Sequence, residues 1–282
     1  QGSPKSQTTD SGGTDQSNGA VYSRLWELFH RTMNDAKKAE WIFFHLHCKT
    51  VGYHNDMYPP SAQGQAREVP VQDQVDEYEV IGPDGYGYPI YALKQNHKAL
   101  YGSLISEQDM AKAYDAGNPY VNRDPRFYRD ITYHGSMFKG KWINTATGAD
   151  AINAANSTST GYFTRKYFDG YYTKGMSGNW NFDAPLIRLA TIYLVYAEAV
   201  TRSKGATPEV YNLMNELRAR SFMAPIPPAA QTNKELLLDY ILRDQDNQNI
   251  ASAMSLSPST VKVHVHNILQ KTGHTNRQEL IQ

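Results

Sequence analysis

Apolar residues recur at helical spacing most clearly between Pro185 and Gly205. Proline suits the first turn of a helix and glycine suits its end, so the pattern predicts one long helix here. Its expected apolar face consists of Leu186, Leu189, Ile192, Tyr193, Tyr196, Ala197 and Val200. A second helix is predicted to begin at Pro208, with an apolar face made of Val210, Leu213, Met214, Leu217 and Phe222. Two helices joined by a short glycine-containing turn form an αα-hairpin.

The chain before this hairpin has shorter and less regular patterns. They predict a helix over Val21–Met33, a buried strand over Trp41–Leu46, a helix over Glu107–Gly117 and an extended segment with Pro125 over Asp124–Tyr133. Closely spaced Gly and Pro between Tyr53 and Gly87 leave room only for loops and short helices or strands. Residues 144–161 contain few large apolar groups and are predicted to form an exposed loop. The expected fold class is therefore mainly α, with long irregular loops and a few short strands.

Composition and the position of prolines suggest how the chain is divided into domains. Residues 1–19 are rich in Gly, Ser, Thr, Gln and Asp and have almost nothing to bury, so we expect a disordered tether. The proline-rich stretch 225–228 is the preferred boundary between a domain over residues 20–228 and a second one over residues 229–282. The chain begins at Gln1 without Met, which suggests that a leader or upstream region has been removed.

Charge and composition exclude some partners and leave others open. The 28 Lys and Arg balance the 28 Asp and Glu, so no global field attracts nucleic acid or an anionic membrane. A single cysteine, Cys48, excludes an intrachain disulfide. No apolar run approaches the roughly 20 residues that span a bilayer. The aromatic share of 12%, led by 20 Tyr, suits a sugar-binding surface, although buried Tyr explains much of it more simply.

Six short segments resemble, in order, the signatures of SusD/RagB proteins. They are PPSAQGQ at 59–65, PVQDQVDEYE at 70–79, DPRFY at 124–128, RKY at 165–167, PLIRLATIYLVYAEAV at 185–200 and LMNELRARSFMAPIP at 213–227. The resemblance implies a non-catalytic α-helical lipoprotein, facing outward on the outer membrane of a Bacteroidetes-type bacterium. Such a protein caps a TonB-dependent transporter and holds an oligosaccharide or peptide nutrient for import.

The chain departs from that family at both ends. Full-length members carry an amino-terminal half of tetratricopeptide-like helical pairs with a lipid-anchored Cys, whereas only the predicted tether precedes residue 20 here. At the other end an Arg- and Glu-rich helix is expected to follow Leu236–Leu242, but an unrelated pattern takes over. A truncated domain that does not close its core is therefore one alternative.

Aromatic residues beside Gly- and Asn-rich loops are the candidate ligand-binding residues. Sugar capture needs flat aromatic faces and a polar rim for the hydroxyls. The candidates are Trp142, Tyr162, Tyr167, Tyr171, Tyr172 and Trp180. For any single one of them, a role in core or loop packing is the simpler interpretation. Charged residues of the helical hairpin, namely Arg188, Glu198, Arg218 and Arg220, are better explained by pairing between helices than by a polar site.

The carboxyl end shows helix-turn-helix spacing. Two helices are predicted over Asn247–Ser255 and Ser257–Thr272, with Pro258 in the first turn of the second and Gly273 after its end. The string NQNIASAMSLSPSTVKVHVHNILQKTGHTNRQELI closely resembles the LuxR-type DNA-binding domain, a small four-helix unit. The resemblance implies that Lys262, Val263 and His266 face the major groove and that Thr260, His264 and Lys271 lie near phosphates. Basic and acidic residues nearly cancel over Asn233–Gln282, so we expect weak, salt-sensitive binding to double-stranded DNA.

The two resemblances imply different compartments, the outer membrane and the cytoplasm. The simplest explanation is a chimaera with its junction between about Pro228 and Asp246. The leading hypothesis is a glycan- or nutrient-binding protein of a TonB-dependent uptake system, and the alternative is a DNA-binding transcriptional regulator or a chain carrying both modules.

Enzymatic and metal chemistry have little support. His45, His47, Cys48 and His54 are possible zinc ligands, but alternate residues of a strand point to opposite faces and no CxxC pair occurs elsewhere. GxSxG, HExxH and phosphate-cradling glycine loops are absent from the sequence. We therefore expect no catalytic residues, no metal and no cofactor.

Overall fold

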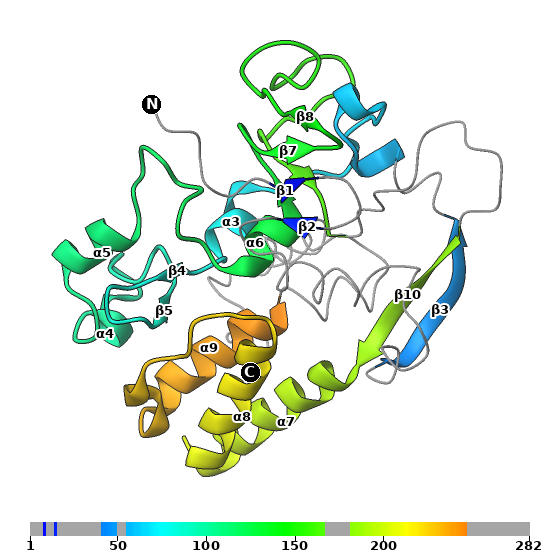
Figure 1. The fold of residues 1–282 in the computed structure, drawn as a ribbon. Coiled ribbons are helices and arrows are strands. Elements are labelled where there is room, and N and C mark those ends of the chain that lie inside the picture. Colours follow the sequence, from blue (N-terminus) through cyan, green and yellow to red (C-terminus); the bar gives the residue numbers. More distant parts are fainter. Residues whose placement is uncertain (1–7, 10–13, 16–40, 50–54, 167–180, 247–282) are drawn as a thin grey trace, which may run out of the picture.

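The computed structural model describes residues 8–9, 14–15, 41–49, 55–166 and 181–246 (Figure 1). Side chains are described for residues 41–43, 55–166 and 187–245. The expected fold class is confirmed, because helices dominate and most strands are two residues long. The predictions over Val21–Met33, Asn247–Ser255 and Ser257–Thr272 lie outside the described residues.

Three helices near the end of the described chain form a helical layer: α7 (Leu189–Lys204), α8 (Pro208–Arg220) and α9 (Lys234–Asp246). Thr207 caps α8, since its side chain accepts a hydrogen bond from the Val210 amide, and Pro208 occupies the first turn. Gly205 ends α7 with a positive φ of 87°. The predicted helical hairpin is therefore confirmed, and the short 3₁₀-helix η3 (Pro228–Gln231) connects it to α9.

The predicted start of α7 at Pro185 is wrong. Residues Asn181–Arg188 form strand β10, which pairs antiparallel with β3 (Trp41–Lys49), and the helix begins only after the extended residue Arg188. Pairing with β3 satisfies the backbone groups that helix formation would otherwise satisfy. A proline is tolerated in this two-stranded sheet, where the register shifts between Pro185 and Ile187. The strand predicted over Trp41–Leu46 is observed as β3. Its predicted burial is wrong for Ile42 and Phe43, which are 54% and 58% exposed, because the strand lies in a two-stranded sheet and not in one of the described core clusters.

The remaining described residues, 55–166, form a loop layer of short elements. The helices are η2 (Pro60–Ala62), α3 (Gln72–Asp76), α4 (Lys98–Tyr101), α5 (Glu107–Ala113) and α6 (Pro125–Asp130). The strand pairs are β4 (Val80–Ile81) with β5 (Gly87–Tyr88), β6 (Ile131–Thr132) with β9 (Phe163–Thr164), and β7 (Met137–Phe138) with β8 (Lys141–Trp142). Short elements between Tyr53 and Gly87 and a loop over 144–161 agree with the predictions.

Two predictions in the loop layer need correction. The segment Asp124–Tyr133 is not wholly extended, because Asp124 caps helix α6 by accepting a hydrogen bond from the Arg126 amide at 2.7 Å, and Pro125 fits the first turn. Helix α5 ends at Ala113 rather than at Gly117, since Tyr114 is already extended at φ −129°.

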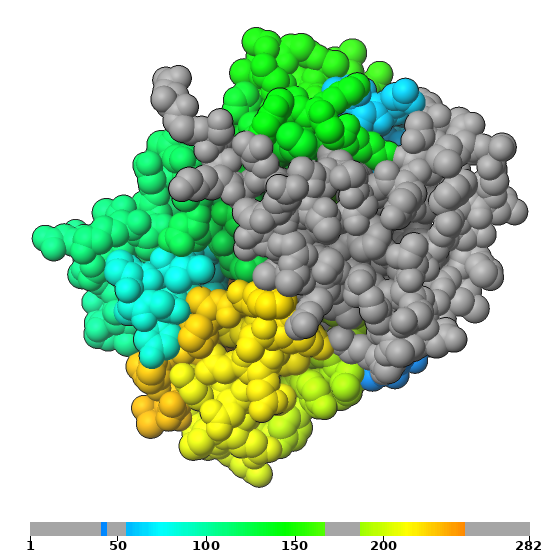
Figure 2. All heavy atoms as spheres, in the orientation of Figure 1, coloured from blue at the N-terminus to red at the C-terminus, as the bar shows by residue number. Residues whose placement is uncertain are grey.

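The helical layer and the loop layer share one core. Leu194 and Ala197 of α7, Met214 of α8 and Tyr240 of α9 are buried together with Tyr101 of the loop layer. On the face drawn in Figure 2, the cyan loop residues lie directly against the yellow and orange helices. Packing therefore continues through α9, beyond the boundary expected at Pro228, because α9 buries its apolar face against α7.

The amino-terminal segment predicted to be a featureless tether contains two short strands. β1 (Thr8–Thr9) and β2 (Thr14–Asp15) pair antiparallel. Within the described part of the chain, no helix has the length and apolar character that crossing a membrane requires.

Candidate functional site

The β7–β8 hairpin presents the most exposed tryptophan of the described residues. We call residues 135–143 the Trp142 hairpin. Met137 pairs with Trp142 and Phe138 with Lys141, and the Ile143 amide donates to the Ser136 carbonyl at 2.9 Å. The Gly135 amide donates to the Ile143 carbonyl at 2.9 Å, which closes the base of the hairpin.

The two strands of this hairpin are joined by a tight two-residue turn. Lys139 and Gly140 both have positive φ, 49° and 71°. Two successive residues with positive φ are typical of the type I′ turn, whose twist matches that of the flanking strands. Glycine adopts this conformation without the steric cost of a Cβ atom. The two strands are thus held close together by the shortest common loop.

Buried side chains anchor the hairpin to the rest of the loop layer. Phe138 and Ile143 are sealed in a small core, and the Phe138 ring meets the Tyr58 ring edge-on at 4.9 Å between centroids. Lys139 Nζ lies 4.8 Å from the centroid of the Tyr58 ring, and Lys141 Nζ donates to the Ser61 carbonyl at 3.0 Å. Lys139 in the turn and Lys141 directly after it therefore both contact the segment that contains η2.

Trp142 itself remains 51% exposed on this anchored support. An indole offers a large flat apolar area together with one N–H donor. Since its backbone is fixed by the hairpin, little conformational freedom is lost when a ligand stacks on the ring. The geometry suits recognition of a flat apolar ligand surface by stacking.

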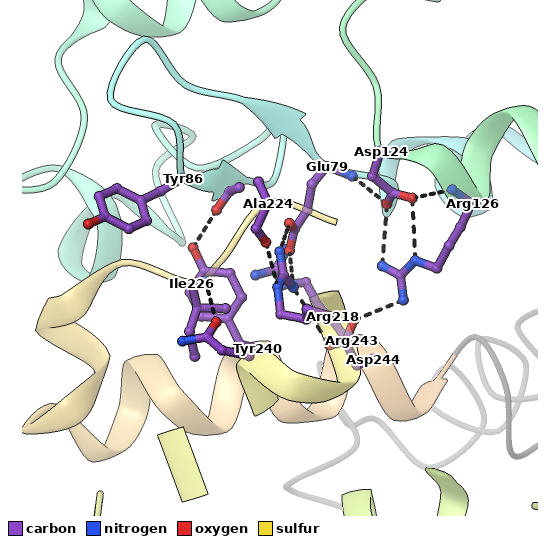
Figure 3. Close-up of polar contacts among 12 residues, drawn as sticks. Glu79, Tyr86, Asp124, Arg126, Arg218, Ala224, Ile226, Tyr240, Arg243 and Asp244 are labelled. Carbon is purple, nitrogen blue, oxygen red and sulfur yellow. Dashed lines mark hydrogen bonds and ion pairs between the residues drawn. The ribbon is translucent and has the colours of Figure 1, made fainter. Parts of the chain in front are cut away.

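A cluster of buried charged side chains joins the helical layer to the loop layer. We call Glu79, Asp124, Arg126, Arg218, Arg243 and Asp244 the ion-pair seam (Figure 3). The Arg218 guanidinium contacts both carboxylate oxygens of Glu79 and lies 3.6 Å from Asp244.

Two further arginines extend this seam on either side. Arg243 Nη1 donates to Glu79 at 3.1 Å. Arg126 pairs with Asp244 at 3.0 Å and with Asp124 at 3.3 Å. Charge-assisted hydrogen bonds therefore link segments far apart in sequence: the residue before β4, the start of α6, and helices α8 and α9.

The arginines of the seam favour the ionised form of the Glu79 carboxylate although that group is buried. Burial alone would raise the pKa of Glu79, but Arg218 and Arg243 outweigh it and hold that pKa below its ordinary value. Gly87 permits the close packing, because a methyl group at this position would overlap with the Glu79 carboxylate and approach Arg218. All six side chains of the seam are buried, so its role is to hold the layers together.

Comparison with known protein families shows to which family this chain belongs. A family model described as the SusD family matches residues 7–246. The chain belongs to the SusD family. A second family model, bacterial regulatory proteins of the luxR family, matches residues 232–282, so the two matches overlap over α9. Both predicted resemblances are confirmed.

Solved structures show the same fold as this SusD family member. A SusD-like carbohydrate-binding protein from Bacteroides fragilis is 21% identical, with a TM-score of 0.59, and the match covers 78% of this chain and 41% of that one. A second SusD-like protein from the same organism is 21% identical, with a TM-score of 0.57, over 85% of this chain and 44% of its own. The chain thus spans less than half the length of these structures. Among curated proteins, none matches it.

One predicted ligand-binding residue of the SusD domain is not available to a ligand. Tyr162 is only 6% exposed, and its hydroxyl donates to Gln72 at 2.9 Å. Its ring packs edge-on against Tyr120 at 6.3 Å, and burial raises the pKa of its hydroxyl. The loop before β9 folds inward, so the simpler interpretation of core packing is correct here. Tyr167, Tyr171, Tyr172 and Trp180 lie outside the described residues.

Two of the four charged residues predicted to pair between the hairpin helices have other partners than expected. Glu198 pairs with Arg202 of the same helix at 2.7 Å, whereas Arg218 of α8 pairs with Glu79 of the loop layer rather than with α7. The sequence did not single out Glu79, Arg126 or Asp244. A signal was present, because Glu79 ends the PVQDQVDEYE segment and Arg126 lies within DPRFY.

The remaining predicted residues cannot be placed. Thr260, Lys262, Val263, His264, His266 and Lys271 of the luxR-type match lie outside the described residues, as do His54 and the side chains of His45, His47 and Cys48. Among the side chains that the structure describes, no three His, Cys, Asp or Glu residues gather as a metal site would require.

Proposed function

We propose that this SusD family chain is a non-catalytic carbohydrate-binding protein whose Trp142 stacks on a sugar ring. The observation that carries the proposal is the half-exposed indole on an anchored hairpin. The apolar face of a pyranose ring is matched by a flat aromatic surface, while the exposed side chains of Lys141 in β8 and Asn144 in the following loop can satisfy hydroxyls at the rim.

The SusD family match also supports a proposal about the biological setting. We propose that the protein holds an oligosaccharide or similar nutrient for a TonB-dependent transporter and acts on the outward face of the outer membrane. Support comes from the SusD family match over residues 7–246 and from the fold shared with a carbohydrate-binding protein of Bacteroides fragilis. Catalysis has no part in this proposal.

Calorimetric titration of the whole chain with a panel of soluble oligosaccharides tests it. We expect Trp142→Ala to weaken binding of any sugar that the wild type binds by at least about fivefold, since removing a central aromatic contact typically costs more than about 1 kcal/mol. Trp142→Phe, which keeps a smaller aromatic face, should retain part of the affinity. Tyr193→Ala removes an exposed aromatic residue of α7 and is the matched control. Unchanged affinity in Trp142→Ala would exclude this site.

A second candidate function is DNA binding by the carboxyl-terminal segment. The luxR family match over residues 232–282 favours it, and we propose that the division between the two modules falls after α9, since α9 packs with α7 and α8. In that case the chain, or a chimaera that carries both modules, acts in the cytoplasm. A gel-shift series across salt concentrations, with Lys262→Ala and His266→Ala as variants, tests this alternative. Both substitutions should weaken any shift that the wild type gives.

A further inference from the structure

Helix α9 lies within both family matches. The SusD family match ends at residue 246 and the luxR family match begins at residue 232, so all of Lys234–Asp246 is common to them. An amphipathic helix buries its apolar face against one set of neighbours. The two matches therefore assign the same helix to two different cores.

In the structure, α9 packs in the SusD domain. Four of its apolar residues are 0% exposed and belong to the core that the two layers share: Leu236, Leu237, Tyr240 and Ile241. All other residues of that core precede residue 232 and so lie outside the luxR family match. From Leu236 to Gln245, every residue of α9 is at least partly buried. The apolar face of the helix is thus already covered.

Polar side chains of α9 also have partners in the SusD domain. The Tyr101 hydroxyl donates to Asp239 and accepts from Arg243 at 2.9 Å. Asp244 pairs with Arg126 at 3.0 Å, as Figure 3 shows. Tyr101 and Arg126 both belong to the loop layer and precede the luxR family match. Charge-assisted hydrogen bonds therefore fix α9 in this position together with its apolar face.

We infer that α9 serves one module at a time, and that its docking in the SusD domain withholds it from the luxR-type segment. The apolar side chains that α9 could bring to a second helical unit are buried or partly buried here. A small unit that lacks one of its helices leaves the apolar faces of the others uncovered. The consequence rests on the second candidate function proposed above: DNA binding by the luxR-type segment requires α9 to leave the SusD core.

The two uses of α9 are then thermodynamically linked. The apparent affinity for DNA equals the intrinsic affinity multiplied by the fraction of chains in which α9 has left the SusD core. A substitution that weakens the docking of α9 should therefore tighten DNA binding. By the same linkage, bound DNA should loosen the SusD domain.

Hydrogen exchange of the full chain, read by mass spectrometry over α9, tests which module holds the helix. The double substitution Tyr101→Phe and Arg126→Met, which we call the release variant, removes partners of α9 without changing any residue of the luxR family match. We expect the protection of the α9 amides to fall at least about tenfold. Lys112→Ala, which breaks the exposed pair with Asp109 in the loop layer, is the matched control and should leave α9 unchanged.

A further substitution, Val261→Asp, places a charge at an apolar position of the luxR-type segment. In the wild-type background it should leave the protection of α9 unchanged, because α9 packs in the SusD domain. In the release variant it should lower that protection at least about fivefold, because α9 is then held by the luxR-type segment. Tyr101→Phe alone provides the same comparison, with smaller changes, if the double variant does not fold.

Two results would overturn the inference. If Val261→Asp lowers the protection of α9 equally in both backgrounds, the helix serves both modules at once. If it has no effect in either background, the luxR-type segment does not take up the released helix.

Fluorescence anisotropy with a short labelled DNA duplex of mixed sequence, at low salt, measures the consequence. The release variant should bind at least about tenfold more tightly than the wild type, and Lys262→Ala should reduce its affinity. Equal, measurable affinities of wild type and release variant would refute the competition. A chain that binds DNA in neither form refutes the DNA-binding candidate instead, and the exchange measurements still decide which module holds α9.

Discussion

In the ion-pair seam charged side chains are buried, whereas in the Trp142 hairpin a large aromatic side chain faces solvent. Arg218 is the largest of the fully buried side chains described, and Trp142 is half exposed. The charged residues of the seam are satisfied by one another, so their burial joins the loop layer to the helical layer. The exposed indole contributes little to the core. Residue type alone thus does not determine whether a side chain is buried, because charged groups that find partners within the fold can be buried and a large aromatic group can remain exposed.

Removing one side of the seam should have the largest effect. Arg218→Met leaves the Glu79 carboxylate buried with only Arg243 to balance it, and breaking a buried ion pair typically costs about 3–5 kcal/mol. Urea unfolding of the whole chain measures this loss. Arg202→Ala, which breaks the exposed pair with Glu198, is the control and should cost about 0.5 kcal/mol or less. Equal costs for the two variants would show that the seam does not join the layers.

Acid should weaken the seam. The pKa of Glu79 is lower in the folded chain than in the unfolded one, so the unfolded state binds more protons as pH falls below about 4.5. The stabilisation that Glu79 contributes is therefore present above that pH and is lost as pH falls through the folded pKa. Each unit of pKa difference corresponds to about 1.4 kcal/mol.

Urea unfolding between pH 6 and pH 3 measures this dependence. The Glu79→Gln variant should be less stable at pH 6 and should show a shallower loss between pH 5 and pH 3. Parallel slopes for wild type and variant would assign the acid sensitivity to other carboxylates, of which Asp130 is the first to test, since Arg129 lowers its pKa against the effect of burial.

The sequence predicted the helical hairpin well because its apolar spacing and its proline and glycine are local signals. The strand Asn181–Arg188 was missed because it depends on pairing with β3, more than 130 residues earlier. Trp142 and Tyr162 are similar in sequence context, yet one lies on a tight hairpin and the other on a loop that folds into the core. The seam was missed because Glu79 and Arg218 meet only after the two layers pack.

The smallest predicted effect concerns the turn that supports Trp142. Gly140 has a φ of 71°, and a side chain at this position is strained even though no atom lies near enough to clash. Gly140→Ala should therefore cost about 1 kcal/mol in urea unfolding. Gly140→Asn is the matched control, because asparagine tolerates this backbone conformation, and it should retain most of the stability. If alanine and asparagine were equally costly, the loss would come from side-chain bulk. The support of Trp142 would then depend on packing rather than on backbone conformation.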